Sequence, residues 1–110
     1  MEDKQLELLN VICKAFSFKS YNDSVTEISR EDGENAKHTI ETYRNEILKL
    51  YPYDNTLKLR SGIKTGRDSI TVLSQLLRRH SMRVIPTPRQ YFWDPQLKKS
   101  FAKNKYKIIS

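Results

Sequence analysis

The sequence predicts a mainly helical domain of four to five helices, with at most one short pair of strands and an extended basic arm at the C-terminus. Apolar residues recur at three- and four-residue steps in several segments, which is the spacing of amphipathic helices. Alternation typical of strands is limited to short stretches near Leu57 and Val84. A chain of 110 residues has the size of one domain, and we expect a helical domain over 1–90 and an arm over 91–110.

The first half of the chain is expected to contain three helices. The longest apolar stripes run from about Asp3 to Phe18 and from about Ala36 to Tyr51. Pro52 ends the second stripe, because proline disfavours helical geometry in the residue before it. Between these stripes, the segment that starts at Ser24 resembles a capping box and predicts one short helix. The acidic run 31–35 contains a glycine and is expected to be a loop.

A further helix is expected to begin after Thr65 and to end near His80. Thr65 with Asp68 three residues later resembles a capping box, with Asp in place of the usual Glu. The segment 54–66 before it is expected to be a short strand or an irregular arm. This segment is too long for the three- or four-residue turn of a simple helix-turn-helix.

The last part of the chain is expected to contain one strand and one short helix. Val84–Ile85 favours a strand, which Pro86 and Pro88 confine to the edge of a sheet. Asp94–Pro95 is a helix-start signal, because aspartate is a good cap and proline suits the first helical position. A winged arrangement is possible, although the sequence offers only one or two strands for it.

Charge is distributed unevenly along the chain. The sequence has 20 basic and 13 acidic residues, which gives a formal charge of +7. Residues 1–55 contain 11 acidic and 7 basic residues, whereas 56–110 contain 13 basic residues against Asp68 and Asp94. A like-charged surface repels itself unless an anionic partner meets it, so this asymmetry favours an anionic partner for the second half. The alternative is that the two halves pack together and partly neutralise each other.

The sequence offers little chemistry for catalysis, and we expect neither an enzyme, a metal site nor a cofactor. Cys13 lies on the apolar stripe of the first helix, where a buried structural thiol is the expected state. His38 and His80 are 42 positions apart and belong to no zinc-binding spacing. Gly62 and Gly66 lack the rest of a nucleotide-binding motif.

A dense cluster of basic residues lies between Thr56 and Gln90, and lysines continue it into the arm. Arginine pairs with phosphate oxygens or guanine edges, and each phosphate contacted by a cation releases condensed counterions. We therefore expect this half to bind DNA or RNA, chiefly through phosphates. Arg78 and Arg79 have a simpler alternative role, because the helix dipole favours cations at a helix end. The candidate contact residues are Lys58, Arg60, Lys64, Arg67, Arg78, Arg79, Arg83, Arg89, Lys98 and Lys99.

Tyr91, Phe92 and Trp93 form an aromatic cluster flanked by basic residues. Aromatic rings among cations stack on single-stranded bases or anchor protein interfaces. One or two of the rings could instead fill the core and keep the arm attached to the domain. We assign all three as candidate partner-binding residues.

Two functions of different classes follow from these patterns. The first is a small non-enzymatic nucleic-acid-binding protein that contacts phosphates through its basic half. The second is a structural or assembly subunit of a larger particle, a virion or a ribonucleoprotein, which docks through its Pro-rich, aromatic and basic arm. An acidic protein surface is a further possible partner of the basic half.

A membrane is the poorest of the partners considered. The apolar side of 94–109 is thin for an interfacial helix. No apolar run approaches the roughly 20 residues that a membrane-spanning helix needs. The N-terminus also has no secretory pattern, so we expect an intracellular protein.

Overall fold

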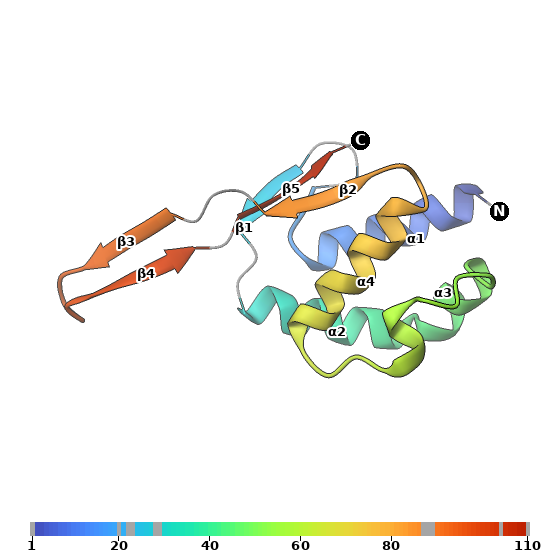
Figure 1. Ribbon diagram of the computed structural model, residues 1–110, viewed down its shortest axis with the longest axis horizontal. Helices are drawn as coiled ribbons and strands as arrows, with labels where there is room; N and C mark the ends of the chain where they lie inside the picture. The colour runs from blue at the N-terminus through green and yellow to red at the C-terminus, as the bar shows by residue number, and fades with distance from the viewer. Residues whose placement is uncertain are drawn as a thin grey trace.

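The computed structural model describes residues 2–19, 21, 24–27, 30–86, 90–103 and 105–109. The described chain is mainly helical, as predicted. Figure 1 shows the helices packed together, a small sheet against them, and a hairpin that projects from this body. The helices are α1 (Glu2–Ala15), α2 (Arg30–Thr42), α3 (Arg44–Leu50), the 3-10 helix η1 (Lys58–Ser61) and α4 (Gly66–Arg78). The strands are β1 (Ser24–Glu27), β2 (Arg83–Pro86), β3 (Gln90–Asp94), β4 (Lys99–Lys103) and β5 (Lys105–Ile109).

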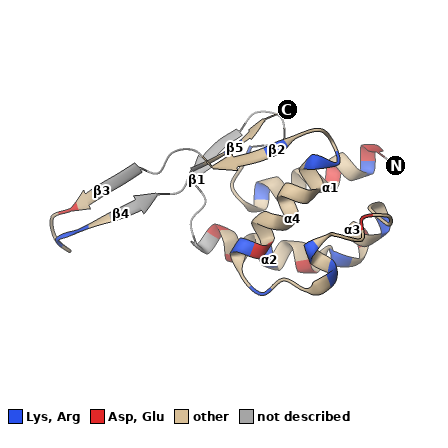
Figure 2. Ribbon diagram, viewed as in Figure 1, with Lys and Arg blue, Asp and Glu red and all other residues tan. Residues whose placement is uncertain are grey.

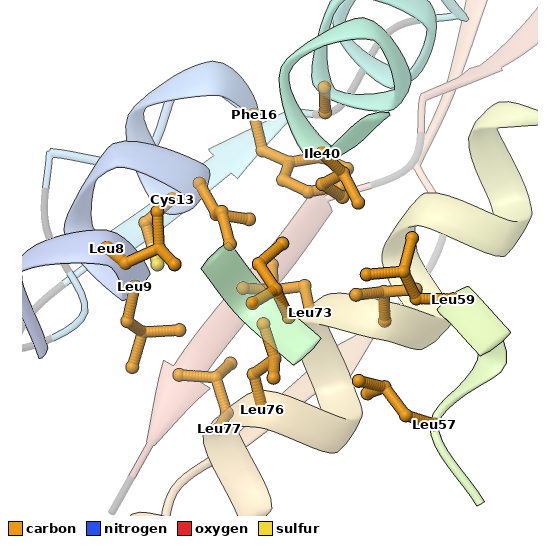
Figure 3. Close-up of a cluster of buried hydrophobic side chains, with 14 of the residues drawn as sticks. Leu8, Leu9, Cys13, Phe16, Ile40, Leu57, Leu59, Leu73, Leu76 and Leu77 are labelled. Atoms are coloured by element: carbon orange, nitrogen blue, oxygen red, sulfur yellow. The ribbon is translucent and has the colours of Figure 1, made fainter. Parts of the chain in front are cut away.

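The helices share one hydrophobic core, to which α1 and α4 contribute more side chains than any other element (Figure 3). The apolar stripes that predicted these two helices are the faces that they bury. Burying one such side chain stabilises the fold by about 1.5–3 kcal/mol. The central residues, each at most 2% exposed, are Leu9, Ile12, Phe16, Ile40, Leu57, Leu59, Leu73, Leu76 and Leu77.

Helices α2 and α4 approach each other so closely that their backbones touch at two glycines. A Cβ atom on Gly66 would lie 3.0 Å from the Cα and the carbonyl carbon of Gly33. A Cβ atom on Gly33 would lie 3.2 Å from the Cα of Gly66. These distances are shorter than those of nearly all Cβ contacts, so a side chain at either position would push the two backbones apart by a few tenths of an ångström. The two glycines therefore allow α4 to begin directly against α2.

The acidic run 31–35 belongs to α2, and the prediction of a loop there was wrong. Acidic residues are favourable in the first turns of a helix, where the helix dipole is positive. Gly33 breaks the helical pattern in the sequence because its role is the contact with Gly66, which sequence spacing cannot reveal. The single helix expected up to Tyr51 is divided in two at Tyr43, whose backbone angles (φ −96°, ψ 13°) depart from helical values.

A three-stranded antiparallel sheet with the order β1-β5-β2 packs beside the helices. In this sheet Ser24 pairs with Ile108, and Ile108 in turn pairs with Val84. The short helix expected at Ser24 is therefore strand β1, and its partner is about 80 residues away in the sequence. The strand predicted at Val84–Ile85 is confirmed as β2. Ile108 is 3% exposed, so the end of the described chain belongs to the core.

Strands β3 and β4 form a separate two-stranded sheet, which projects from the body as a hairpin (Figure 1). The helix expected after Asp94–Pro95 is absent, because Asp94 ends β3 and Pro95 begins the hairpin turn. The arm expected over 91–110 is likewise shorter, since β5 returns to the body and only the hairpin extends from it. The β structure thus exceeds the single strand pair that the sequence led us to expect.

Replacing Gly66 with alanine tests the contact between α2 and α4. Overpacking of this kind costs about 1–3 kcal/mol, and the atoms that would have to move belong to the backbone of Gly33. We expect the free energy of unfolding to fall by that amount in urea titrations followed by circular dichroism. Asn35→Ala, an exposed change within α2, is the control and should not destabilise the protein. A more stable Gly66→Ala protein would show that helix propensity outweighs the contact.

Candidate nucleic-acid interface

Helix α4 has one face in the core and an opposite face in solvent. Ser69, Val72, Leu73, Leu76 and Leu77 form the buried face. Steps of four, three and four residues place the other face on a single line along the helix. This line, which we call the α4 stripe, consists of Arg67, Thr71, Ser74 and Arg78, all exposed except the half-buried Ser74. It is about 16 Å long and has an arginine at each end.

The beginning of α4 is fixed by the capping box that the sequence predicted. The Thr65 side chain accepts a hydrogen bond from the amide of Asp68 (3.3 Å). The Asp68 carboxylate accepts from the amides of Lys64 (2.8 Å) and Thr65 (3.1 Å). The hydrogen bond from the amide of Lys64 is the main cause of a lowered pKa for Asp68. The single acidic residue of α4 is therefore engaged with the backbone at the start of the helix.

A side chain of α4 also holds the basic segment that precedes the helix. Gln75 accepts a hydrogen bond from the amide of Lys58 (2.7 Å) and donates one to the carbonyl of Thr56 (2.8 Å). Because η1 starts at Lys58, this pair of bonds fastens η1 against α4. Figure 2 shows the result, with basic residues at both ends of α4 and in the segment before it.

The structure places most of the predicted phosphate-binding residues at the surface. Lys58 is half-buried, and Arg89 lies outside the described residues. Lys98 and Lys99 lie at the turn of the hairpin, which is a different element from the one that carries the α4 stripe. Those that are exposed are Arg60, Lys64, Arg67, Arg78, Arg79, Arg83, Lys98 and Lys99.

Arg60 and Arg79 bind other parts of the domain, although both are exposed. Arg60 donates from its Nε to the carbonyl of Asp54 (2.8 Å), and its terminal nitrogen reaches the carbonyls of Tyr51 (3.4 Å) and Pro52 (3.3 Å). Arg79 forms an ion pair with Asp54, in which the Nε and Oδ2 atoms are 3.1 Å apart. Both arginines therefore stabilise the loop between α3 and η1, a role that charge density alone did not indicate.

Asp54 is the residue around which this loop is built. It is 5% exposed, and its Oδ1 accepts hydrogen bonds from the amide (3.2 Å) and the hydroxyl (2.8 Å) of Thr56. The hydrogen bond from Arg79 is the largest cause of a lowered pKa for Asp54, and burial opposes it. A buried carboxylate needs such partners, because an unpaired buried charge is very unfavourable. Arg79 thus anchors the end of α4 to the loop.

Among the predicted partner-binding aromatics, the structure describes one side chain. Trp93 lies on β3 and is 63% exposed. Tyr91 and Phe92 are placed on the same strand, and their side chains lie outside the described part. The idea that this cluster fills the core is therefore excluded for Trp93.

Cys13, Tyr51 and His80 carry reactive groups, and the structure gives each of them a role in packing or hydrogen bonding within the fold. Cys13 is fully buried, and burial raises its pKa to about 12, so the group is a neutral thiol. The Tyr51 hydroxyl and the Nε2 of His80 are 2.8 Å apart, which ties the end of α4 to the end of α3. Within the described ranges, no group of three or more His, Cys, Asp or Glu residues is arranged to hold a metal ion.

Replacing Arg79 with glutamine tests the anchor at Asp54 through its dependence on pH. The pKa of Asp54 is lower in the folded chain than in the unfolded one, so its contribution to stability is complete above the ordinary value near 4. This contribution is lost as the pH falls through the folded-state pKa. Without Arg79 the pKa moves back towards its usual range, and the stability of the variant should fall less steeply between neutral pH and about pH 3.

The measurement is a set of urea titrations across this pH range. Arg78→Gln removes the same charge from the neighbouring residue and is the matched control, which should keep the pH dependence of the wild type. Asp68 titrates in the same range in all three proteins, so only a difference between variants reports on Asp54. Identical pH profiles for the Arg79 variant and the wild type would show that the ion pair contributes nothing.

No helix in the described part of the chain is long and apolar enough to cross a membrane. The chain matches no protein-family model, no curated protein and no solved structure.

Proposed function

We propose that the chain is a small nucleic-acid-binding protein that places the α4 stripe in the major groove of duplex DNA. The stripe is the observation that carries this proposal. It is a straight line on a helix whose other side is packed in the core, with the two arginines and Thr71 exposed and Ser74 half-buried. The arginines are hydrogen-bond donors, and the Thr71 hydroxyl, which donates to the carbonyl of Arg67 (3.3 Å), can still accept. Such a line fits a groove about 12 Å wide better than the deep, narrow major groove of duplex RNA.

The chemistry of the stripe suits phosphates at its ends and base edges at its centre. Arg67 and Arg78 are about 16 Å apart along the helix, so they can reach the two sides of a groove. Arginine pairs with phosphate oxygens in a bidentate manner, or with the O6 and N7 atoms of guanine. Thr71 and Ser74 lie between them, and hydroxyl groups of this kind contact phosphates or bases. The exposed Lys64 and Arg83 add positive charge before and after the helix.

The connectivity of the domain supports the same proposal. Helix α4 packs against α2, is followed by β2, and a projecting hairpin joins β2 to β5 of the same sheet. This order of elements is similar to that of a winged helix-turn-helix, except that α3 and η1 replace the short turn between the two helices. In helix-turn-helix proteins the second helix enters the major groove. Fold alone does not establish function, so the α4 stripe remains the main argument.

The salt dependence of binding tests the role of the stripe. If about six phosphates are contacted, the logarithm of the affinity should fall with the logarithm of salt concentration with a slope near −5. Replacing Arg67 and Arg78 together with alanine should weaken the binding of duplex DNA by about tenfold for each residue. It should also make the slope less steep by about 2. Fluorescence anisotropy with labelled duplexes measures both quantities.

A shallow groove lies between α1 and α3, and the exposed Lys4 and Lys49 are among the residues that line it. These two lysines provide the matched control, because their double alanine variant removes the same charge from a surface away from the α4 stripe. This variant should bind nearly as well as the wild type, apart from the small effect of a lower net charge. Equal losses in the two double variants would show that net charge, and not the α4 stripe, drives binding. If duplex DNA does not bind at low salt, the proposal is wrong and an acidic protein surface becomes the partner to seek.

A further inference from the structure

The turn of the β3–β4 hairpin is held in one shape by its own residues. Asp94 and Lys99 form the last pair of the ladder before the turn. The Oδ1 atom of Asp94 accepts hydrogen bonds from the amides of Gln96 (2.9 Å) and Leu97 (3.2 Å). Lys98 closes the turn in the left-handed region, with φ at 50°. The single acidic side chain of the segment 90–103 is thus engaged with the backbone of the turn.

This ordered turn presents two large apolar side chains to solvent. Trp93 is 63% exposed and Leu97 is 60% exposed. The residue opposite Trp93 on β4 is Ser100, which is small and itself exposed, so it covers little of the indole ring. An isolated two-stranded hairpin is only marginally stable in water, and here its end lies away from the core (Figure 1). An exposed tryptophan in this position indicates a contact surface.

The charge around Trp93 indicates the chemistry of the partner. The segment 90–103 that forms the hairpin contains three lysines and one acidic residue, Asp94, which is engaged with the turn. Lys98 and Lys99 are exposed beside the turn. An aromatic ring among lysines suits a strand of nucleic acid, because the ring stacks on a base while the ammonium groups meet the phosphates. Two apolar side chains give too little area to hold the hairpin in a lipid surface.

We propose that Trp93 stacks on an unpaired base, so that the ligand is DNA in which a duplex adjoins an unpaired strand. This inference rests on the proposed function and names its ligand class. The α4 stripe carries no aromatic residue and suits a duplex, whereas a base inside a duplex is already stacked on both sides and offers no face to an indole. The hairpin forms one end of the molecule, which is 51 Å long, so a ligand that contacts both surfaces must extend beyond the α4 stripe (Figure 1).

The fluorescence of Trp93 tests this inference directly, because it is the single tryptophan of the sequence. The full chain is titrated with a blunt duplex of about two helical turns and with the same duplex carrying an overhang of about ten nucleotides. Both DNAs should bind, and fluorescence anisotropy of the labelled DNA measures this binding. Stacking quenches indole emission, so only the DNA with the overhang should quench Trp93. Anionic lipid vesicles serve as a third ligand.

Two variants extend the test to affinity. Trp93→Ala should weaken binding of the overhang DNA by about tenfold and leave the blunt duplex unaffected. Trp93→Phe keeps an aromatic ring and should restore part of the loss. Tyr53→Ala is the control, because Tyr53 is an aromatic residue that is 90% exposed but lies before η1 and not on the hairpin. It should bind both DNAs as the wild type does.

The outcomes separate this inference from the function on which it rests. Binding of both DNAs with equal emission changes would overturn the stacking of Trp93 and leave the role of the α4 stripe intact. A shift of Trp93 emission with vesicles but not with DNA would assign the hairpin to a membrane surface and would also overturn the stacking of Trp93 on a base. Failure of both DNAs to bind at low salt would overturn the two proposals together.

Discussion

The position of α4 depends on the contact between Gly33 and Gly66, and the outer surface of the domain follows from that position. The two backbones can touch because neither residue has a side chain, so α4 starts at one point on α2. Gln75 then joins the helix to the segment before it, and Arg79 joins its end to Asp54. One face of α4 is therefore packed in the core, and these contacts hold its beginning, its side and its end. The α4 stripe is the part of the helix that remains in solvent.

The positive charge of the second half has two separate roles in this arrangement. Arg60 and Arg79 hold a loop together by contacting carbonyl oxygens and a buried carboxylate. Arg67 and Arg78 lie at the two ends of the α4 stripe and are exposed. Their side chains are therefore available to the major groove proposed above. Both acidic residues of the half are engaged by backbone amides, Asp68 at the helix cap and Asp94 in the hairpin turn. Local backbone geometry therefore leaves the basic residues to set the character of this surface.

Features that depend on neighbouring residues could be predicted from the sequence, and those that depend on distant residues could not. The apolar period of α1 and α4 and the Thr65 cap are local, and the structure confirms them. The sequence around β1 resembles the start of a capped helix. Its pairing with β5 could not be foreseen, because β5 lies about 80 residues away in the sequence. Asp94 makes the hydrogen bonds of a helix cap, but the pairing of β3 with β4 turns the chain back.

The candidate site shows the same division. Continuing the helical spacing from Arg67 would have found Thr71 and Ser74, so this part of the α4 stripe was accessible to sequence reasoning. The ion pair of Arg79 was not, because nothing in the sequence brings Asp54 beside it. Likewise, the exposure of Trp93 depends on a hairpin that projects from the body, whereas three adjacent aromatics in a sequence more often fill a core.

The most direct test of the account is to locate the binding surface by NMR. Amide signals of the nitrogen-15-labelled full chain are recorded while duplex DNA is added at low salt. The account predicts that the largest shifts fall between Lys64 and Arg79 and at Arg83, and that the amides lining the groove between α1 and α3 stay unchanged. Shifts centred on that groove, or spread evenly over the chain, would contradict a role for the α4 stripe in binding.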